Sequence, residues 1–371
     1  DNNRVAADLT RDLTSALGRF GALRVVPVEE TEVRADYTLS GEVRPGGSGL
    51  QTFLQLTDDR VHQQVWSRNF DVRLADLPLV SGQASALIAG FPGAIVTSEY
   101  KRIVGKEASK LNAYECIVQG VMASALQTPD PTVRAASCLN RLVSSDPRNA
   151  LAWAALAGVM IVQRSWGFGL PDQQVKDFGK RVYLNAEILN AALRAVDLAP
   201  DEPFVRSTLA SGYWANCQRD MLRSETEKAV ALNPYDANTL GYLGNRLVYS
   251  GEFELGASMS ERALALMGHT APVLWWWGPA KRDWYRGHYQ KAYEEFQRAY
   301  VEQVWLTHLD MAYSLPLIGR AEEAKAEVGK LLKMLPGFTI RDAVEWYRII
   351  CLPADFREKM AGALRQAGLP D

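Results

Sequence analysis

The sequence predicts a small α+β domain followed by an all-α domain of stacked helical hairpins. Helix-end phrases recur about every 34 residues over the last two thirds of the chain. Pro200 and Pro234 are 34 residues apart, and so are Ala229 and Ala263. A period of this length, with small residues inside and Pro or Gly at the end, is typical of a solenoid. The opening part shows instead short alternating segments separated by turn residues, which is typical of antiparallel strands.

The first domain is placed at residues 1–105, as an antiparallel-rich sheet with two helices. Residues 4–20 carry a leucine-rich helical face, and a short β-like run follows at 23–28. Three alternating segments with turns between them predict an antiparallel meander, at residues 36–43, 50–57 and 62–70. A helical stretch from about 79 to 103 completes the domain, and Pro92 predicts a kink or a break in it.

The second domain, residues 106–371, aligns on its Pro and Gly ends as six hairpins and two final helices that we expect to cap the open end. The expected elements are 110–126 with 131–144, a second hairpin from 149, then 202–233, 236–267, 272–301 and 304–335, and the helices 339–350 and 354–366. Pro147 and Pro200 are 53 residues apart, which places an insertion at about 164–182. Because the insertion carries several apolar residues, we expect a loop with a short helix that folds back and covers part of the groove.

Composition excludes several classes of function. The chain of 371 residues has a formal net charge of −2, so it offers no overall attraction for nucleic acid or anionic lipid. No uninterrupted apolar run approaches the roughly 20 residues that cross a bilayer, so we expect no transmembrane segment in this chain. The chain opens at Asp1 with neither an initiator Met nor a signal peptide, which indicates a processed or excised fragment.

The sequence shows no arrangement of catalytic or metal-binding residues. The four histidines occur singly, without a carboxylate or Cys at ligand spacing, so surface or packing roles are favoured over metal binding. The glycine-rich run 44–49 lies between two predicted strands and lacks the Lys-Ser/Thr of a phosphate-binding loop, which favours a hairpin turn. We therefore predict no enzymatic activity, no metal and no cofactor.

Particular residues recur at fixed positions of the repeat. They are Trp153, Leu156, Ala157, Ala195 and Pro200, then Leu209, Tyr213, Ala229 and Pro234, and then Leu243, Gly244, Gly251 and Ala263. This set resembles the signature of tetratricopeptide repeats, which implies a tetratricopeptide solenoid. The sixth hairpin departs from the signature, with Leu331 where Ala is usual.

The first domain carries two longer phrases, at 6–26 and 35–71, followed by a helix. In content and order they resemble the TolB-like domain that precedes such repeats in bacterial membrane-anchored winged-helix regulators and in class III adenylate cyclases. The first strand that is usual for that domain is missing before Asp1. One sheet edge is therefore expected to be open, and because open edges pair with other strands, a homodimer is one expectation.

The resemblance implies the sensory or partner-binding region of a bacterial signal-transduction protein. It also implies an upstream effector on the same polypeptide, either a winged-helix DNA-binding domain or an adenylate cyclase. No direct contact with nucleic acid is expected of the present region. Two alternatives stay open: a stand-alone assembly scaffold, and a hydrolase or synthase in the first domain, against which the missing motifs argue.

In tetratricopeptide proteins the inner helix faces line a concave groove that holds a partner peptide or protein. The repeat register places these residues there: Phe204, Trp214, Asn238, Asn245, Tyr249, Trp277, Lys281, Trp284 and Tyr313. Aromatic rings and amides suit binding, because rings supply contact area and amides hydrogen-bond an extended backbone. Two interpretations stay open, a groove that binds a ligand and a groove that the chain itself fills.

Cys116 and Cys138 lie in the two helices of the first predicted hairpin, at similar distances from its turn. Antiparallel helices rise equally per residue, so the two positions lie at similar heights. A disulfide needs Cα atoms within about 7 Å, which packed helices can supply. Two buried free thiols are the alternative. A disulfide would imply an oxidising compartment, so we expect a periplasmic location, with a cytoplasmic one as the alternative.

Overall fold

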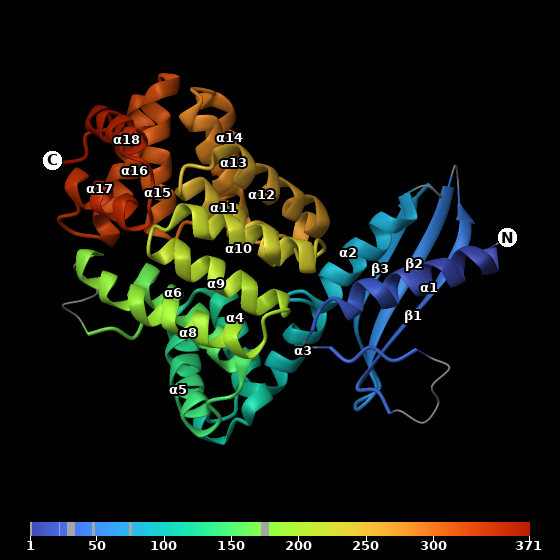
Figure 1. Cartoon of the computed structure of the whole chain (residues 1–371). Helices are drawn as coiled ribbons and strands as arrows, with labels where there is room; N and C mark the ends of the chain where they lie inside the picture. The colour runs from blue at the N-terminus through green and yellow to red at the C-terminus, as the bar shows by residue number, and fades with distance from the viewer. Residues whose placement is uncertain (1, 22, 28–33, 47–48, 74–75, 172–177) are drawn as a thin grey trace.

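The computed structural model describes residues 2–21, 23–27, 34–46, 49–73, 76–171 and 178–371. A small sheet with its helices lies at one end of the molecule, and an array of helical hairpins forms the rest (Figure 1). This arrangement confirms the predicted fold class, an α+β domain followed by a tetratricopeptide-like solenoid.

The N-terminal domain is a three-stranded antiparallel sheet in the order β1-β2-β3. Its elements are α1 (Asn2–Gly18), β1 (Tyr37–Gly46), β2 (Gly49–Asp58), β3 (Gln63–Val72), α2 (Leu77–Ala89) and α3 (Ala94–Ile103). Leucines from α1 and β2 and Val80 from α2 form its core. The strand expected at 23–28 is absent from residues 23–27, and residue 28 lies outside the described part. Residues 23–27 pair with none of the described strands, and Pro27 has no N–H to donate to one.

The expected break in the helix at 79–103 is present between α2 and α3, at the cis Phe91–Pro92 peptide. Leu77–Ile103 is long and apolar enough to cross a membrane by length and composition alone. In this fold 72% of its apolar window is buried, as in the core helix of a folded domain.

The solenoid consists of consecutive antiparallel hairpins. They are α4 (Ala113–Leu126) with α5 (Pro129–Ser145), α6 (Ala150–Trp166) with α8 (Leu184–Leu198), α9 (Pro203–Ala215) with α10 (Arg219–Leu232), α11 (Ala237–Tyr249) with α12 (Phe253–Met267), α13 (Trp277–Tyr285) with α14 (Tyr289–Arg298), and α15 (Trp305–Ser314) with α16 (Ala321–Met334). Small residues allow the close approach within a hairpin. A Cβ at Gly244 of α11 would lie 2.6 Å from the carbonyl oxygen of Gly256 of α12.

The two domains pack against each other through α2 and α12, and α3 packs on α4 (Figure 1). A Cβ at Gly82 of α2 would lie 2.6 Å from the ring of Tyr235, so glycine is needed for this approach. Gln83 donates a hydrogen bond to the carbonyl of Ala265 across the same junction, at 3.4 Å. The N-terminal domain, called the head below (residues 1–105), is therefore in direct contact with the repeats.

The insertion and the C-terminal helices meet on the inner side of the solenoid. Within the described part of 164–182, the chain ends α6 and then forms the 3₁₀ helix η3 (Phe178–Tyr183), with no strand; residues 172–177 lie outside the description. Helix η3 contacts α17 (Ile340–Ile349), and α18 (Ala354–Gln366) contacts α15. Helix α17 thus turns back toward the inner helix faces.

Candidate ligand-binding cavity

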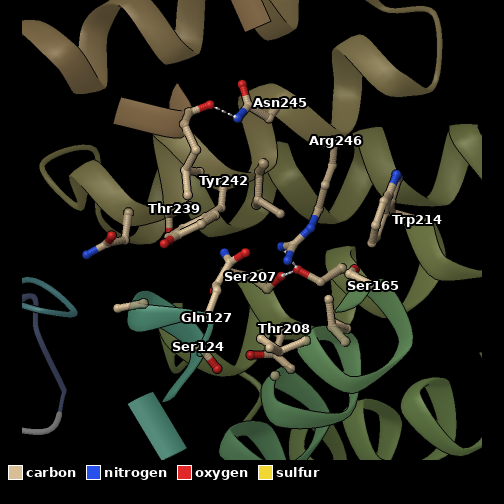
Figure 2. Close-up of a pocket in the computed structure, with 18 of the residues that line it drawn as sticks. Ser124, Gln127, Ser165, Ser207, Thr208, Trp214, Thr239, Tyr242, Asn245 and Arg246 are labelled. Carbon is tan, nitrogen blue, oxygen red and sulfur yellow. Dashed lines mark hydrogen bonds between the residues drawn. The ribbon is translucent and has the colours of Figure 1, made fainter. Parts of the chain in front are cut away.

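A cavity of about 180 Å³ lies between the inner faces of α4, α6, α9 and α11 (Figure 2). The end of α17 closes part of it through Trp346 and Ile350. Polar side chains come from each of the four solenoid helices: Ser124 and Gln127, Ser165, Ser207, Thr208 and Ser211, and Asn238, Thr239, Tyr242, Asn245 and Arg246. Aromatic rings line the remaining wall, at Phe91, Trp166, Phe204, Trp214, Tyr249 and Trp277.

Helical spacing directs these side chains to one place. Within α11, the lining residues Asn238, Tyr242, Asn245 and Tyr249 recur at intervals of three and four, which places them on one face. The neighbouring helix α9 presents Phe204, Ser207, Ser211 and Trp214 in the same way. The hydroxyl of Ser211 donates to a backbone carbonyl of its own helix at 2.7 Å, so its lone pairs remain as acceptors.

The structure divides the residues predicted for the groove into two sets. Those that line the cavity are Phe204, Trp214, Asn238, Asn245, Tyr249 and Trp277. Lys281, Trp284 and Tyr313 do not line it, because the chain's own C-terminal helices cover them and each is 0% exposed. Direct ligand contact therefore stays a prediction for the first set, and the second set belongs to the interior.

A buried ion pair occupies the covered half of the groove. Lys281 of α13 donates to both carboxylate oxygens of Asp310 of α15, at 3.1 and 3.2 Å. Tyr313 and Tyr347 each donate a hydroxyl hydrogen bond to the same carboxylate. Burial lowers the pKa of Lys281, and Asp310 opposes that shift. Because Tyr347 comes from α17, this network fixes α17 against two repeats.

Trp284 shows how α18 fills its part of the groove. The Trp284 ring packs on Phe356 of α18 with centroids 4.6 Å apart, and on Tyr313 at 5.0 Å. Both partners are themselves fully buried. The second interpretation left open by the sequence, a groove that the chain itself fills, therefore describes this half.

The end of α17 is anchored to α6 and to the end of α9 by several bonds that sequence reasoning missed. Trp214 donates its indole N–H to the carbonyl of Ile350 at 3.1 Å. Buried Arg164 donates to the carbonyls of Ile349 and Ala215. A disulfide joins Cys217 to Cys351, 134 residues later in the chain. Neither Cys217 nor Cys351 was assigned a partner from the sequence, because residues 134 positions apart give no local sign that they pair.

The structure also contains the disulfide considered for the first hairpin. Cys116 of α4 and Cys138 of α5 are bonded, with Cα atoms 5.6 Å apart. Both side chains are buried, at 1% and 0% exposure. All four cysteines of the chain are therefore paired.

Arg246 supplies the positive charge of the cavity. Its side chain extends into the middle of the pocket, with Trp214 on one side and Tyr242 and Gln127 on the other (Figure 2). It donates to the hydroxyl of Ser211 and lies over the Trp214 ring, 5.3 Å from the centroid. Burial lowers the pKa of Arg246 to about 10, so it is a cation at neutral pH. The sequence register did not single it out.

Several polar atoms of the wall have no hydrogen-bond partner among the described residues. They are the hydroxyl of Tyr242, the amide oxygen of Asn238 and the indole nitrogen of Trp277. Burial raises the pKa of Tyr242 to about 12, so its hydroxyl stays protonated and can donate. Buried polar groups are normally satisfied, and such a cluster facing a cavity is typical of a site that a ligand or water completes.

No protein-family model and no curated protein matches the chain. Similar solved structures include a monomeric IFIT1 mutant with m7Gppp-AAAA, at TM-score 0.51 and 17% identity over 71% of this chain and 57% of that one. The Cut9–Hcn1 structure of APC/C has a TM-score of 0.49 and 14% identity, and the match covers 79% of this chain and 56% of that one. A tetratricopeptide repeat protein from Parabacteroides merdae has a TM-score of 0.39 and 18% identity, and the match covers 69% of this chain and 91% of that one. The IFIT1 likeness shows the fold alone, and the chain spans little more than half of the first two proteins.

Proposed function

We propose that this chain is a non-enzymatic binding module. Its interior cavity holds either a small molecule or the end of a peptide or protein segment. The observation that carries the proposal is the cavity itself, where aromatic rings meet donors and acceptors that the described protein residues leave unpaired. Recognition sites combine an apolar wall with a few polar groups that orient the ligand in this way.

The volume of the cavity limits what it can admit. A cavity of about 150 Å³ lined by apolar side chains holds benzene. At about 180 Å³, this one accommodates one side chain with a few backbone atoms, or one small molecule. An extended peptide has no room, because α17 and α18 already cover the inner faces of α13 and α15. A peptide ligand can therefore place only one of its ends in the cavity.

We further infer that the module is the sensory part of a bacterial signalling protein and lies in the periplasm. The resemblance to a TolB-like head implies an effector upstream, a winged-helix DNA-binding domain or an adenylate cyclase. The contact of α2 with α12 supports a relay from the repeats to the head. The two disulfides support an oxidising compartment. A stand-alone scaffold fits the same fold, and the sequence upstream of Asp1 distinguishes the two.

A cavity-filling variant tests the binding proposal. Ser124→Phe places a ring in the cavity from α4 and should weaken binding of peptides selected from a random library by about tenfold or more, because the site loses its volume. The matched control is Ser144→Phe, at an exposed position on the neighbouring helix α5. Binding by Ser144→Phe should equal that of the natural chain. Equal binding by Ser124→Phe would contradict the proposal.

A further inference from the structure

The cavity holds a half-buried cation, Arg246, without an anion beside it in the described part of the chain. Arg246 makes a hydrogen bond to Ser211 and a ring contact with Trp214, both of which are neutral. The groups that raise its pKa are two phenols, those of Tyr242 and Tyr249. Over the described ranges of the chain, no carboxylate forms an ion pair with it. Buried charges in proteins are normally paired, because desolvating an unpaired charge is costly.

The surrounding charges do not compensate Arg246. A second guanidinium, that of Arg164, also lies over the Trp214 ring, 5.3 Å from its centroid, and in the described part of the chain it donates hydrogen bonds only to neutral oxygens. Asp236 lines the cavity, but it lies ten residues before Arg246 at the start of α11. That separation is about 15 Å along a helix, and the Asp236 carboxylate is already bonded to Thr239 and the backbone N–H of Asn238. The wall therefore carries an uncompensated positive potential.

Neutral donors stand beside Arg246. Tyr242 is one helical turn earlier on α11, and its hydroxyl is unpaired. Gln127 accepts from the indole of Trp166 at 2.7 Å through its amide oxygen, which leaves its NH₂ group as a donor beside the Tyr242 hydroxyl and the cavity. A guanidinium flanked by a phenol and an amide is a set of donors that suits a carboxylate. The rings of Trp214 and Trp277 form the apolar wall next to these donors.

We propose that the cavity binds a small monocarboxylate with a flat apolar body, whose carboxylate pairs with Arg246 and bonds Tyr242, and whose body lies against Trp214 and Trp277. This inference rests on the proposed binding function and specifies the chemistry of its ligand. A free organic acid and the last residue of a peptide both present this group. The limited volume favours the free acid, because a peptide must leave its remaining chain at the mouth of the cavity.

Probes that differ only in charge test the proposal on the full chain. Phenylacetate, its neutral amide phenylacetamide and the cation phenethylamine are titrated by calorimetry at pH 7. Phenylacetate should bind about tenfold or more tightly than phenylacetamide, because one charge-assisted hydrogen bond to a buried group is worth about that ratio. Phenethylamine should not bind measurably. Equal affinity for the acid and the amide, or no binding of the acid, overturns the proposal.

Peptide probes distinguish the source of the carboxylate. The dipeptide N-acetyl-glycyl-phenylalanine is compared with its C-terminal amide. If the free acid is the natural class, phenylacetate binds more tightly than this dipeptide. A dipeptide that binds more tightly than phenylacetate, with loss on amidation, would overturn the assignment to a free acid.

The variant Arg246→Met separates a ligand-binding role from a structural one. Without ligand its melting temperature should be at or above that of the natural chain, because an unpaired half-buried cation is removed. It should bind phenylacetate and phenylacetamide equally. The control Arg223→Met, at an exposed residue of α10, should keep the preference for the acid. A lower melting temperature for Arg246→Met, together with an unchanged preference for the acid, overturns the proposal.

These outcomes keep the carboxylate inference distinct from the binding function itself. If the natural chain binds the acid and the amide equally and Ser124→Phe binds neither, the cavity is a binding site and the carboxylate assignment fails. If Ser124→Phe binds every probe and every selected peptide as the natural chain does, the cavity is not the site and both fail.

Discussion

The pKa values of two neighbouring carboxyls, Asp283 on α13 and Glu295 on α14, shift in opposite directions. Glu295 is 7% exposed, and one of its oxygens has no partner in the described part of the chain. Burial, together with the nearby charge of Asp283, raises the pKa of Glu295 to about 7. Burial also acts on Asp283, but hydrogen bonds from Arg282, Lys291 and His288 outweigh it and hold the pKa of Asp283 well below its usual value. Below about pH 7 Glu295 therefore keeps its proton in the folded chain, while Asp283 is ionised.

The Glu295 shift predicts a pH dependence of stability. Between about pH 4.5 and 7, the unfolded chain has released the Glu295 proton and the folded chain still holds it, so the free energy of unfolding falls as pH rises. Glu295→Gln should remove this slope and raise the free energy of unfolding at pH 8 by about 1–3 kcal/mol. Urea unfolding from pH 4.5 to 8 measures both chains. Parallel pH profiles would show that Glu295 is not the responsible group.

Residue positions on helix faces could be predicted, but the surroundings of a residue could not. The repeat register placed Trp214, Asn245 and Trp277 on one inner surface, and all three line the cavity, because helical periodicity alone fixes a face. Nothing in the sequence separates Arg246 from an exposed arginine such as Arg223. The difference is that the helices around Arg246 come from distant parts of the sequence and, among the described residues, place no carboxylate in an ion pair with it.

At the scale of elements, each predicted hairpin of the solenoid corresponds to an observed pair of helices, because each depends on local periodicity and on Pro or Gly at its ends. The final helices differ in this respect. Local amphipathicity predicted α17 and α18 as helices, but not the surface on which they lie. That surface is decided by contacts such as Tyr347 with Asp310 and Trp214 with Ile350, which join residues 37 and 136 positions apart.

The Cys217–Cys351 disulfide should hold α17 in the groove. The double variant Cys217→Ser with Cys351→Ser loses a link that spans 134 residues, so its free energy of unfolding should fall by about 3–5 kcal/mol. Amide hydrogen exchange in α17 should become faster, because α17 can then open while the repeats stay folded. Denaturant unfolding and hydrogen exchange with mass spectrometry measure the two effects.

The chain contains a matched control for this prediction. The double variant Cys116→Ser with Cys138→Ser removes a link that spans only 22 residues within one hairpin. It should cost less stability, because a shorter loop restricts the unfolded chain less. Exchange in α17 should remain as in the natural chain. An α17 that exchanges equally in both double variants would contradict the closing role of Cys217–Cys351.

At the scale of the whole molecule, the cavity is lined by Phe91 of the N-terminal domain, by the inner helices of the repeats, and by Trp346 and Ile350 at the end of α17. The head reaches the repeats at Gly82 and Tyr235, and α17 reaches them from the opposite end of the chain. Composition and repeats predicted the two kinds of domain. They could not predict this arrangement, because it depends on how consecutive hairpins are inclined to one another. Homodimer formation through an open sheet edge stays a prediction.

The location of a bound ligand tests this account most directly. A crystal of the full chain soaked with 4-bromobenzoate reports the position of the bromine through its anomalous scattering. We predict a single strong bromine signal between Trp214 and Trp277, with the carboxylate of the ligand on the guanidinium of Arg246. A bromine on the outer surface, or an empty cavity under conditions where solution binding is saturated, would contradict the account.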